Sequence, residues 1–201
     1  MGKIDVKLLI QFVMFVFLSL FATACSITHK VHEDYSQYLY NNVGRNYLTK
    51  TNIDTWYSLS PSTEKHRYEF RSALVGYANL WVVEFGEILD KTMQSKDVKD
   101  AFYRIEKYTS VDVDGNLIVF DLLGYSFTDF GAHIEMKVSF VANKKLIFEK
   151  IYKSDGKTQG AKMFWGGVFA MKNAIQQSTK LALDEILRNF MVDIVKYSVL
   201  R

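Results

Sequence analysis

The feature that most constrains this chain is an apolar run near its start that ends at its only cysteine. Residues 8–24 (LLIQFVMFVFLSLFATA) include only three polar side chains in 17 positions, and Lys3 and Lys7 precede them. A positively charged start followed by an apolar run and small residues is typical of a secretory signal peptide. We therefore predict that residues 1–24 are a signal peptide and that the rest of the chain is exported.

The cysteine at the end of this run indicates a candidate lipoprotein signal. Ala22 and Ala24 lead directly to Cys25, and this arrangement resembles the lipobox of bacterial lipoproteins, in which a lipid is attached to the cysteine and the peptide is cut just before it. Two alternatives remain open: an uncleaved anchor helix, because about 17 to 25 residues span a bilayer, and a buried core helix. By resemblance to enteric lipoproteins, Ser26 favours sorting to the outer membrane, facing the periplasm.

Charge and cysteine content exclude several classes of protein. The formal net charge is +3, and Lys and Arg are scattered among acidic residues rather than gathered in a patch, so we expect no nucleic-acid partner. One cysteine allows neither an intramolecular disulfide nor a multi-cysteine metal site. We therefore expect Cys25 to serve lipidation.

The mature chain divides into a polar segment and a domain. Residues 26–65 are polar and rich in tyrosine, and we interpret residues 25–65 as a lipidated tether with a short helix at 32–40. Residues 66–201 carry longer apolar patterns and predict a single domain.

Within that domain, hydrophobic periodicity predicts one strand, a helix, four further strands and a long final helix. Alternating or β-rich runs predict strands, and apolar residues at i, i+3, i+4 and i+7 predict amphipathic helices. The strands are expected at 66–72, 102–113, 117–127, 132–142 and 145–153, with a hairpin turn at 114–116, and the helices at 72–94 and 168–198. This order predicts an α+β fold: an antiparallel sheet of about four to five strands with two amphipathic helices packed on one face.

Motifs that suggest chemistry are incomplete. Residues 155–158 (DGKT) lack the first glycine of a phosphate-binding loop, and residues 112–116 lack the ligands of a calcium loop. His29 and His32 lie near acidic residues in the predicted tether, where a solvated segment explains them better than a metal site. We expect no metal, no cofactor other than the covalent lipid on Cys25, and no enzymatic activity.

One apolar segment stands out as a candidate binding surface. Residues 156–171 (GKTQGAKMFWGGVFAM) combine four glycines with large apolar side chains. Such a segment either caps the core or forms an exposed patch, and exposed patches mark contacts with proteins, ligands or membranes. The candidate surface residues are Phe164, Trp165 and Phe169, with Trp81 as a neighbour.

Several short patterns carry a family resemblance. Cys25, the Tyr-x-Leu-x-Pro pattern of residues 57–61, the 78–81 segment and a final helix through Asp193 resemble the ABC-type transport auxiliary and YajG-like lipoproteins of bacterial envelopes. This resemblance implies a membrane-tethered, non-enzymatic accessory subunit, without catalytic residues to transfer.

Two functions from different classes fit these expectations. The first is a lipid-anchored binding subunit that docks a protein complex of the envelope through an apolar surface. The alternative is a periplasmic carrier or chaperone that holds a lipid or another hydrophobic ligand in a cleft between the long helix and the sheet. An enclosed apolar cavity would favour the carrier.

Overall fold

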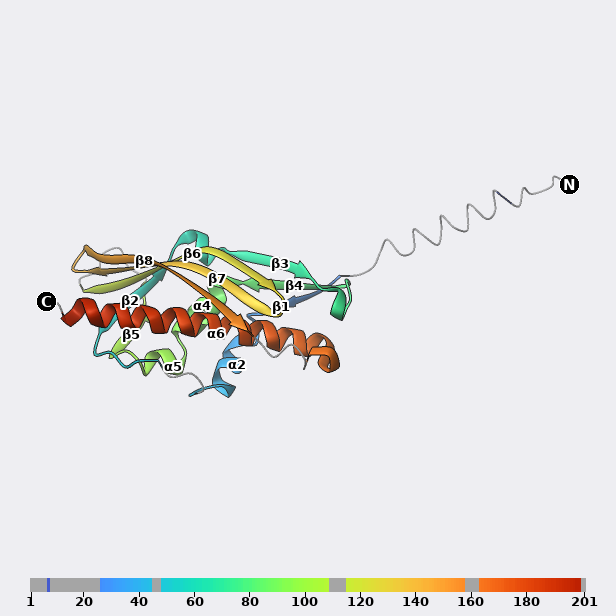
Figure 1. Cartoon of the computed structure of the whole chain (residues 1–201), viewed down its shortest axis with the longest axis horizontal. Coiled ribbons are helices and arrows are strands. Elements are labelled where there is room, and N and C mark those ends of the chain that lie inside the picture. The colour runs from blue at the N-terminus through green and yellow to red at the C-terminus, as the bar shows by residue number, and fades with distance from the viewer. Residues whose placement is uncertain (1–6, 8–25, 45–47, 109–114, 158–162, 200–201) are drawn as a thin grey trace.

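The computed structural model describes residue 7 and residues 26–44, 48–108, 115–157 and 163–199 (Figure 1). Cys25 and nearly all of the predicted signal peptide therefore lie outside the described residues. The strands are β1 (Ile27–Lys30), β2 (Asp54–Leu59), β3 (Arg67–Arg71), β4 (Asn79–Glu84), β5 (Arg104–Lys107), β6 (Asn116–Thr128), β7 (Gly131–Ala142) and β8 (Lys145–Lys157). The helices are α2 (Tyr35–Asn41), α3 (Pro61–Glu64), α4 (Phe85–Met93), α5 (Lys96–Lys99) and α6 (Met163–Val199), with a 3₁₀ turn η1 (Ala73–Val75).

Three long strands form the antiparallel meander that the sequence predicts. Along β7, Ile134, Met136 and Val138 are buried and the residues between them are more exposed, as expected for a sheet with one wet face. The β7–β8 turn at Asn143 and Lys144 has φ values of 48° and 65°, the backbone of a two-residue hairpin whose twist matches the strands. The strand predictions at 117–127, 132–142 and 145–153 are confirmed.

Strand β2 changes the topology of this sheet. The strand order is β5-β2-β6-β7-β8, and β2 pairs in parallel with both β5 and β6. Two strands that both run parallel to β2 cannot form a hairpin with each other, so the predicted β5–β6 hairpin is wrong. The sequence prediction did not include β2 as a strand. Burial nevertheless alternates along it, since Thr55, Tyr57 and Leu59 are buried and the residues between them are not.

A second sheet brings the residues that follow Cys25 into the fold. Its strand order is β1-β4-β3, with β1 parallel and β3 antiparallel to β4. The prediction of a strand at 66–72 is confirmed by β3. The description of residues 25–65 as a tether does not hold for β1 and β2, which are paired strands, although α2 falls within the short helix expected at 32–40.

The predicted helix at 72–94 is wrong over its first half. Gly76 has a φ of 87°, which a helix does not accommodate, and residues 79–84 form β4. Strand β4 is the middle strand of its sheet, and four of its six residues are buried, three of them in succession. Its apolar run therefore has no two-residue alternation to distinguish it from a helix. Only α4, from Phe85 to Met93, is helical.

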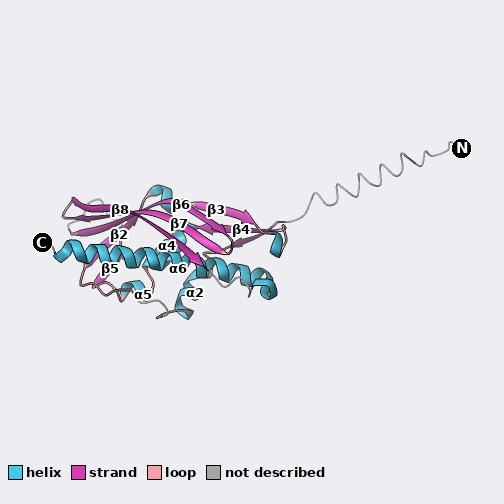
Figure 2. Cartoon of the chain, in the orientation of Figure 1, coloured by secondary structure: helices cyan, strands magenta, loops and turns pink. Residues whose placement is uncertain are grey.

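The long helix α6 confirms the prediction at 168–198 and extends it toward the N-terminus. Figure 2 shows α6 running along the sheets, and it packs on β7 and β8. Its stripe of Ile175, Ile186, Phe190 and Ile194 is fully buried. The α+β class is thus confirmed, but the single antiparallel sheet is corrected to two mixed sheets of three and five strands. Among the described residues, no helix combines the length and apolar character needed to cross a membrane.

Candidate functional site

Of the three residues predicted to form an apolar surface near the start of α6, Phe169 is the one whose side chain the structure describes. Its side chain is 87% exposed, whereas Met171, two positions along α6, is buried. Gly167 has non-helical angles (φ 54°, ψ −136°) that kink α6 just before this residue. The side chains of Phe164 and Trp165 lie outside the described set, although both residues belong to the first turn of α6. Among the residues of this surface whose side chains are described, Phe169 is the exposed large apolar one, and binding by this surface stays a prediction.

Trp81 is a correction to the predicted surface. It lies in the middle strand β4 with no exposed area, and it stacks on the imidazole of His29 with 4.5 Å between ring centroids. A fully buried indole does not contact a partner, so Trp81 belongs to the core. The error follows from assigning residues 72–94 to a surface helix.

A second group of exposed apolar side chains was missed by sequence reasoning. Ile27 at the start of β1, Leu74 in η1 and Tyr77 just before β4 are 55%, 58% and 69% exposed. We call these three residues the tip. Arg71 braces it, donating from Nη2 to the Ser26 hydroxyl at 2.9 Å and from Nη1 to the Tyr77 carbonyl. No sequence signal marked the tip, because its members come together only when β1 pairs with β4.

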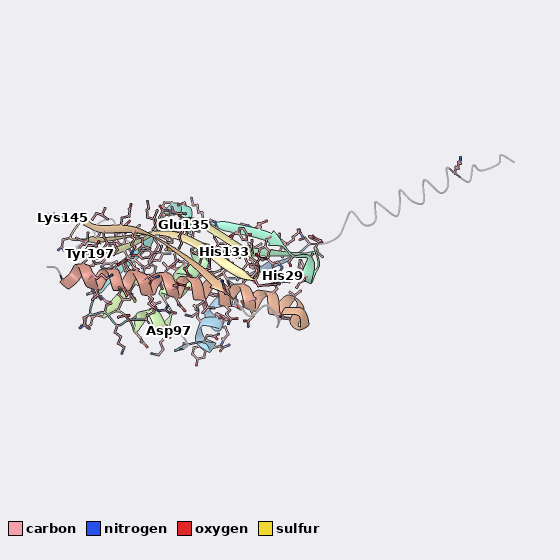
Figure 3. All side chains as sticks on the ribbon, viewed as in Figure 1. His29, Asp97, His133, Glu135, Lys145 and Tyr197 are labelled. Atoms are coloured by element: carbon pink, nitrogen blue, oxygen red, sulfur yellow. The ribbon has the colours of Figure 1, made fainter. Side chains whose placement is uncertain are left out.

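The tip and Phe169 occupy the same end of the molecule. The η1 turn contacts α6, and Figure 1 places η1 and the N-terminal turns of α6 together, next to the start of β1. In Figure 3, His29 lies toward this end, while Lys145 and Tyr197 lie at the other. Two regions distant in sequence therefore expose apolar side chains toward the same end of the molecule.

The histidines nearest Cys25 have separate partners. His29 Nε2 is 2.8 Å from Asn79 Oδ1, and His32 Nδ1 is 2.8 Å from Glu84 Oε2. Searched over the described ranges, the chain contains no group of three or more His, Cys, Asp or Glu side chains placed to hold a metal. Each imidazole instead links β1 or the residues after it to β4.

The other two histidines differ in their surroundings. His66 packs edge-on against Phe85 and Tyr125 with centroid distances of 6.1 and 6.3 Å, and burial lowers the pKa of its imidazole. His133 Nδ1 lies 2.7 Å from Asp155 Oδ1 at an open hollow of about 330 Å³ on the wet face of the meander (Figure 3). Neither histidine has a serine or cysteine nucleophile in contact with it among the hydrogen bonds of the described chain.

A buried group of charges joins α5 to α6. The Lys180 ammonium lies 2.7 Å from Asp184 Oδ2 and 3.8 Å from Asp97 Oδ2, and all three side chains are largely removed from solvent. Buried charges persist when they are paired. Because this group is enclosed, it holds two helices together and is closed to a substrate.

The side chains that α6 places against the sheet are buried. Leu183, Leu187 and Phe190 are each no more than 1% exposed where α6 covers the sheet. Of the two hollows described, one lies at His133 on the wet face of the meander, and the other, of about 250 Å³, lies beside Tyr40 and Lys91. Neither of these two hollows is the cleft between α6 and the sheet that the carrier hypothesis requires.

Comparisons with known proteins show low similarity. No family model matches the chain, and no curated protein matches it. Protein XCC0632 from Xanthomonas campestris, of family DUF330, has 11% identity and a TM-score of 0.49 over 75% of this chain and 90% of its own. The hypothetical protein CT253 from Chlamydia trachomatis has 11% identity and a TM-score of 0.38 over 74% of this chain and all of its own. The resemblance to envelope auxiliary lipoproteins stays a prediction.

Proposed function

We propose that this chain is a membrane-anchored, non-enzymatic binding subunit that docks a protein complex of a bacterial envelope. Acylation of Cys25 holds it on the membrane, in our proposal the outer membrane facing the periplasm. The apolar surface around Phe169 then contacts the partner. The partner is a protein whose docking face lies near the membrane, because Phe169 lies at the end of the domain that follows Cys25.

The exposure of Phe169 is the observation that carries this proposal. Large aromatic side chains are favoured anchors of protein interfaces, and Phe169 is the most exposed large apolar residue of the described chain. Its neighbours Phe164 and Trp165 belong to the same stretch of α6.

A photocrosslinking amino acid at position 169 tests the docking surface in the bacterium that produces the full chain. The matched control is the same group at Tyr103, which is 77% exposed and precedes β5, the sheet edge opposite β8. We expect a discrete protein adduct from position 169 and none from position 103. Adducts at neither position, or at both equally, would contradict docking through this surface.

The anchor is tested separately by mass spectrometry of the membrane-bound protein. A diacylglyceryl group on an N-terminal Cys25 is the expected result. An unmodified Met1 would exclude lipidation and favour the uncleaved anchor helix. Since the two experiments have different readouts, either half of the proposal can fail alone.

The carrier remains the alternative candidate, with less support. The α6 side chains that face the sheet are buried, and neither of the two described hollows lies between α6 and the sheet. A lipid adduct instead of a protein adduct at position 169 would reverse this preference.

A further inference from the structure

We propose that the tip, formed by Ile27, Leu74 and Tyr77, inserts into the interfacial layer of the same membrane that holds Cys25. The lipid surface is thus contacted twice, once by the covalent anchor and once by the folded domain. This inference rests on the anchoring part of the proposed function. It assigns a binding role to residues outside the Phe169 surface.

Distance along the chain is the first argument. Cys25 precedes Ile27 by two residues, and two residues span at most about 7 Å. Ile27 is already a paired strand residue, because its N–H donates to the carbonyl of Ala78 at 2.9 Å. No flexible linker separates the anchor from the sheet, so the end of the sheet is at the membrane surface whichever anchor is used.

The chemistry of the exposed side chains is the second argument. Ile27 and Leu74 are aliphatic, and Tyr77 combines an apolar ring with a hydroxyl, which suits the boundary between headgroups and acyl chains. All three are more than half exposed. In water these side chains would form an unprotected apolar end, whereas a bilayer surface covers all of them together.

Charge is the third argument. Residues 26–32 and 70–83, which include the tip and the strands that lead away from it, contain no Asp or Glu. The exposed basic side chain at the tip is Arg71, which hydrogen bonds to Ser26 and Tyr77. Basic side chains beside an apolar surface favour membranes with anionic lipids. A membrane with anionic lipids would repel carboxylates. The acidic residues that flank these two ranges in the sequence are Glu33, Glu69 and Glu84.

The tip is also held firmly enough to act as a unit. Arg71 hydrogen bonds connect the end of β3 to Ser26 and to the backbone of Tyr77. The Asn79 side-chain amide donates to the carbonyl of Val75 at 2.6 Å and closes the loop that carries Leu74 and Tyr77. Little conformational freedom remains to be lost on insertion, so the apolar contact is not offset by ordering of the loop.

Tryptophan quenching by brominated lipids tests this contact in the anchored full chain. The Tyr77→Trp variant is purified from the membranes of the producing bacterium and reconstituted in phosphatidylethanolamine and phosphatidylglycerol vesicles with brominated acyl chains. The parent chain supplies the background of its own tryptophans. The matched control is Tyr103→Trp, and Leu74→Trp is a second reporter should Tyr77→Trp not fold.

We expect bromine to quench the emission added at position 77 or 74 roughly twofold, as for side chains about 5 to 10 Å into the interface, and to leave that added at position 103 unchanged. Unquenched emission at 77 and 74 from protein that floats with the vesicles overturns the inference while the anchor stands. It would then favour a protein partner for the tip. Failure of the protein to float with vesicles contradicts the anchor, and with it this inference, whereas docking through Phe169 is decided by its own crosslinking experiment.

Discussion

Apolar side chains are packed together at one end of this domain and exposed at the other. At the end marked by Lys145 and Tyr197 (Figure 3), Phe148 stacks on Tyr197 at 4.7 Å and contacts Phe190 at 5.8 Å. At the other end, Leu74 in η1 and Tyr77 just before β4 are both more than half exposed. We call the first region the body and compare it with the tip.

The tip side chains are exposed although helix α6 reaches the tip. Helix α6 shields the apolar face of β7 and β8 along the body, and it also contacts η1. It buries Val75 in part while leaving Leu74 uncovered. Core residues should therefore contribute to folding, and tip residues to binding.

The largest effect is expected in the body. Phe190 has no exposed area and packs against three aromatic rings. Phe190→Ala should lower the free energy of unfolding by about 3 to 5 kcal/mol, because it removes apolar contacts and leaves a cavity. Urea denaturation followed by circular dichroism measures this change. A loss near that of a surface substitution would mean that the body is not the stabilising core.

A glycine where β8 meets the middle of α6, outside both the body and the tip, should give the next largest effect. A Cβ added to Gly156 would lie 1.7 Å from the carbonyl oxygen of Ser178 on α6. Gly156→Ala should cost about 1 to 3 kcal/mol or more, since α6 or β8 must shift. The matched control is Gly124→Ala in β6, where a Cβ meets nothing within 4 Å. Equal thermal unfolding of the two variants would refute the close approach of α6 to β8.

His66, between the two regions, predicts a dependence on pH. Burial lowers the pKa of its imidazole from 6.5, so the folded chain takes up a proton less readily than the unfolded chain. Stability is complete above the ordinary pKa of histidine and falls as the pH drops below it toward the lower, folded pKa. In His66→Gln this fall should be reduced. Unfolding measured at pH 7.5 and at pH 5.5 tests the prediction, and an unchanged pH difference would exclude His66 as its source.

The smallest effect on stability is expected at the tip. Leu74→Ser and Tyr77→Ser alter exposed side chains and should change the free energy of unfolding by less than about 0.5 kcal/mol. Thermal unfolding of the full chain in detergent gives the comparison with Phe190→Ala. A loss above 1 kcal/mol would place these side chains in the core and remove the distinction between tip and body.

The sequence predicted the parts of the fold that are local. Strands β6 to β8 follow the chain in order, with alternating burial and tight turns, so their patterns are sufficient to recognise them. The stripe on α6 is equally local. In the candidate surface, Phe169 was recognised as an apolar residue in a glycine-rich stretch, and its exposure agrees with that prediction.

The errors concern strands whose partners are distant in sequence. Strand β4 has a helix-like apolar spacing, and only pairing with β1 and β3 makes it a strand. Strand β2 was included in a predicted tether, although it separates β5 from β6. The placement of Trp81 on a surface follows from the first error, because a middle strand is covered on both sides.

By itself, then, the sequence determined the α+β class, the meander and the long helix, and it predicts an anchor at Cys25. Each of these depends on neighbouring residues and on side-chain periodicity. Only the tertiary structure decided that the chain enters a sheet at Ile27, two residues after Cys25. It also decided that Leu74 and Tyr77 gather beside Ile27, because parallel pairing of β1 with β4 joins segments about fifty residues apart and no local pattern encodes that contact.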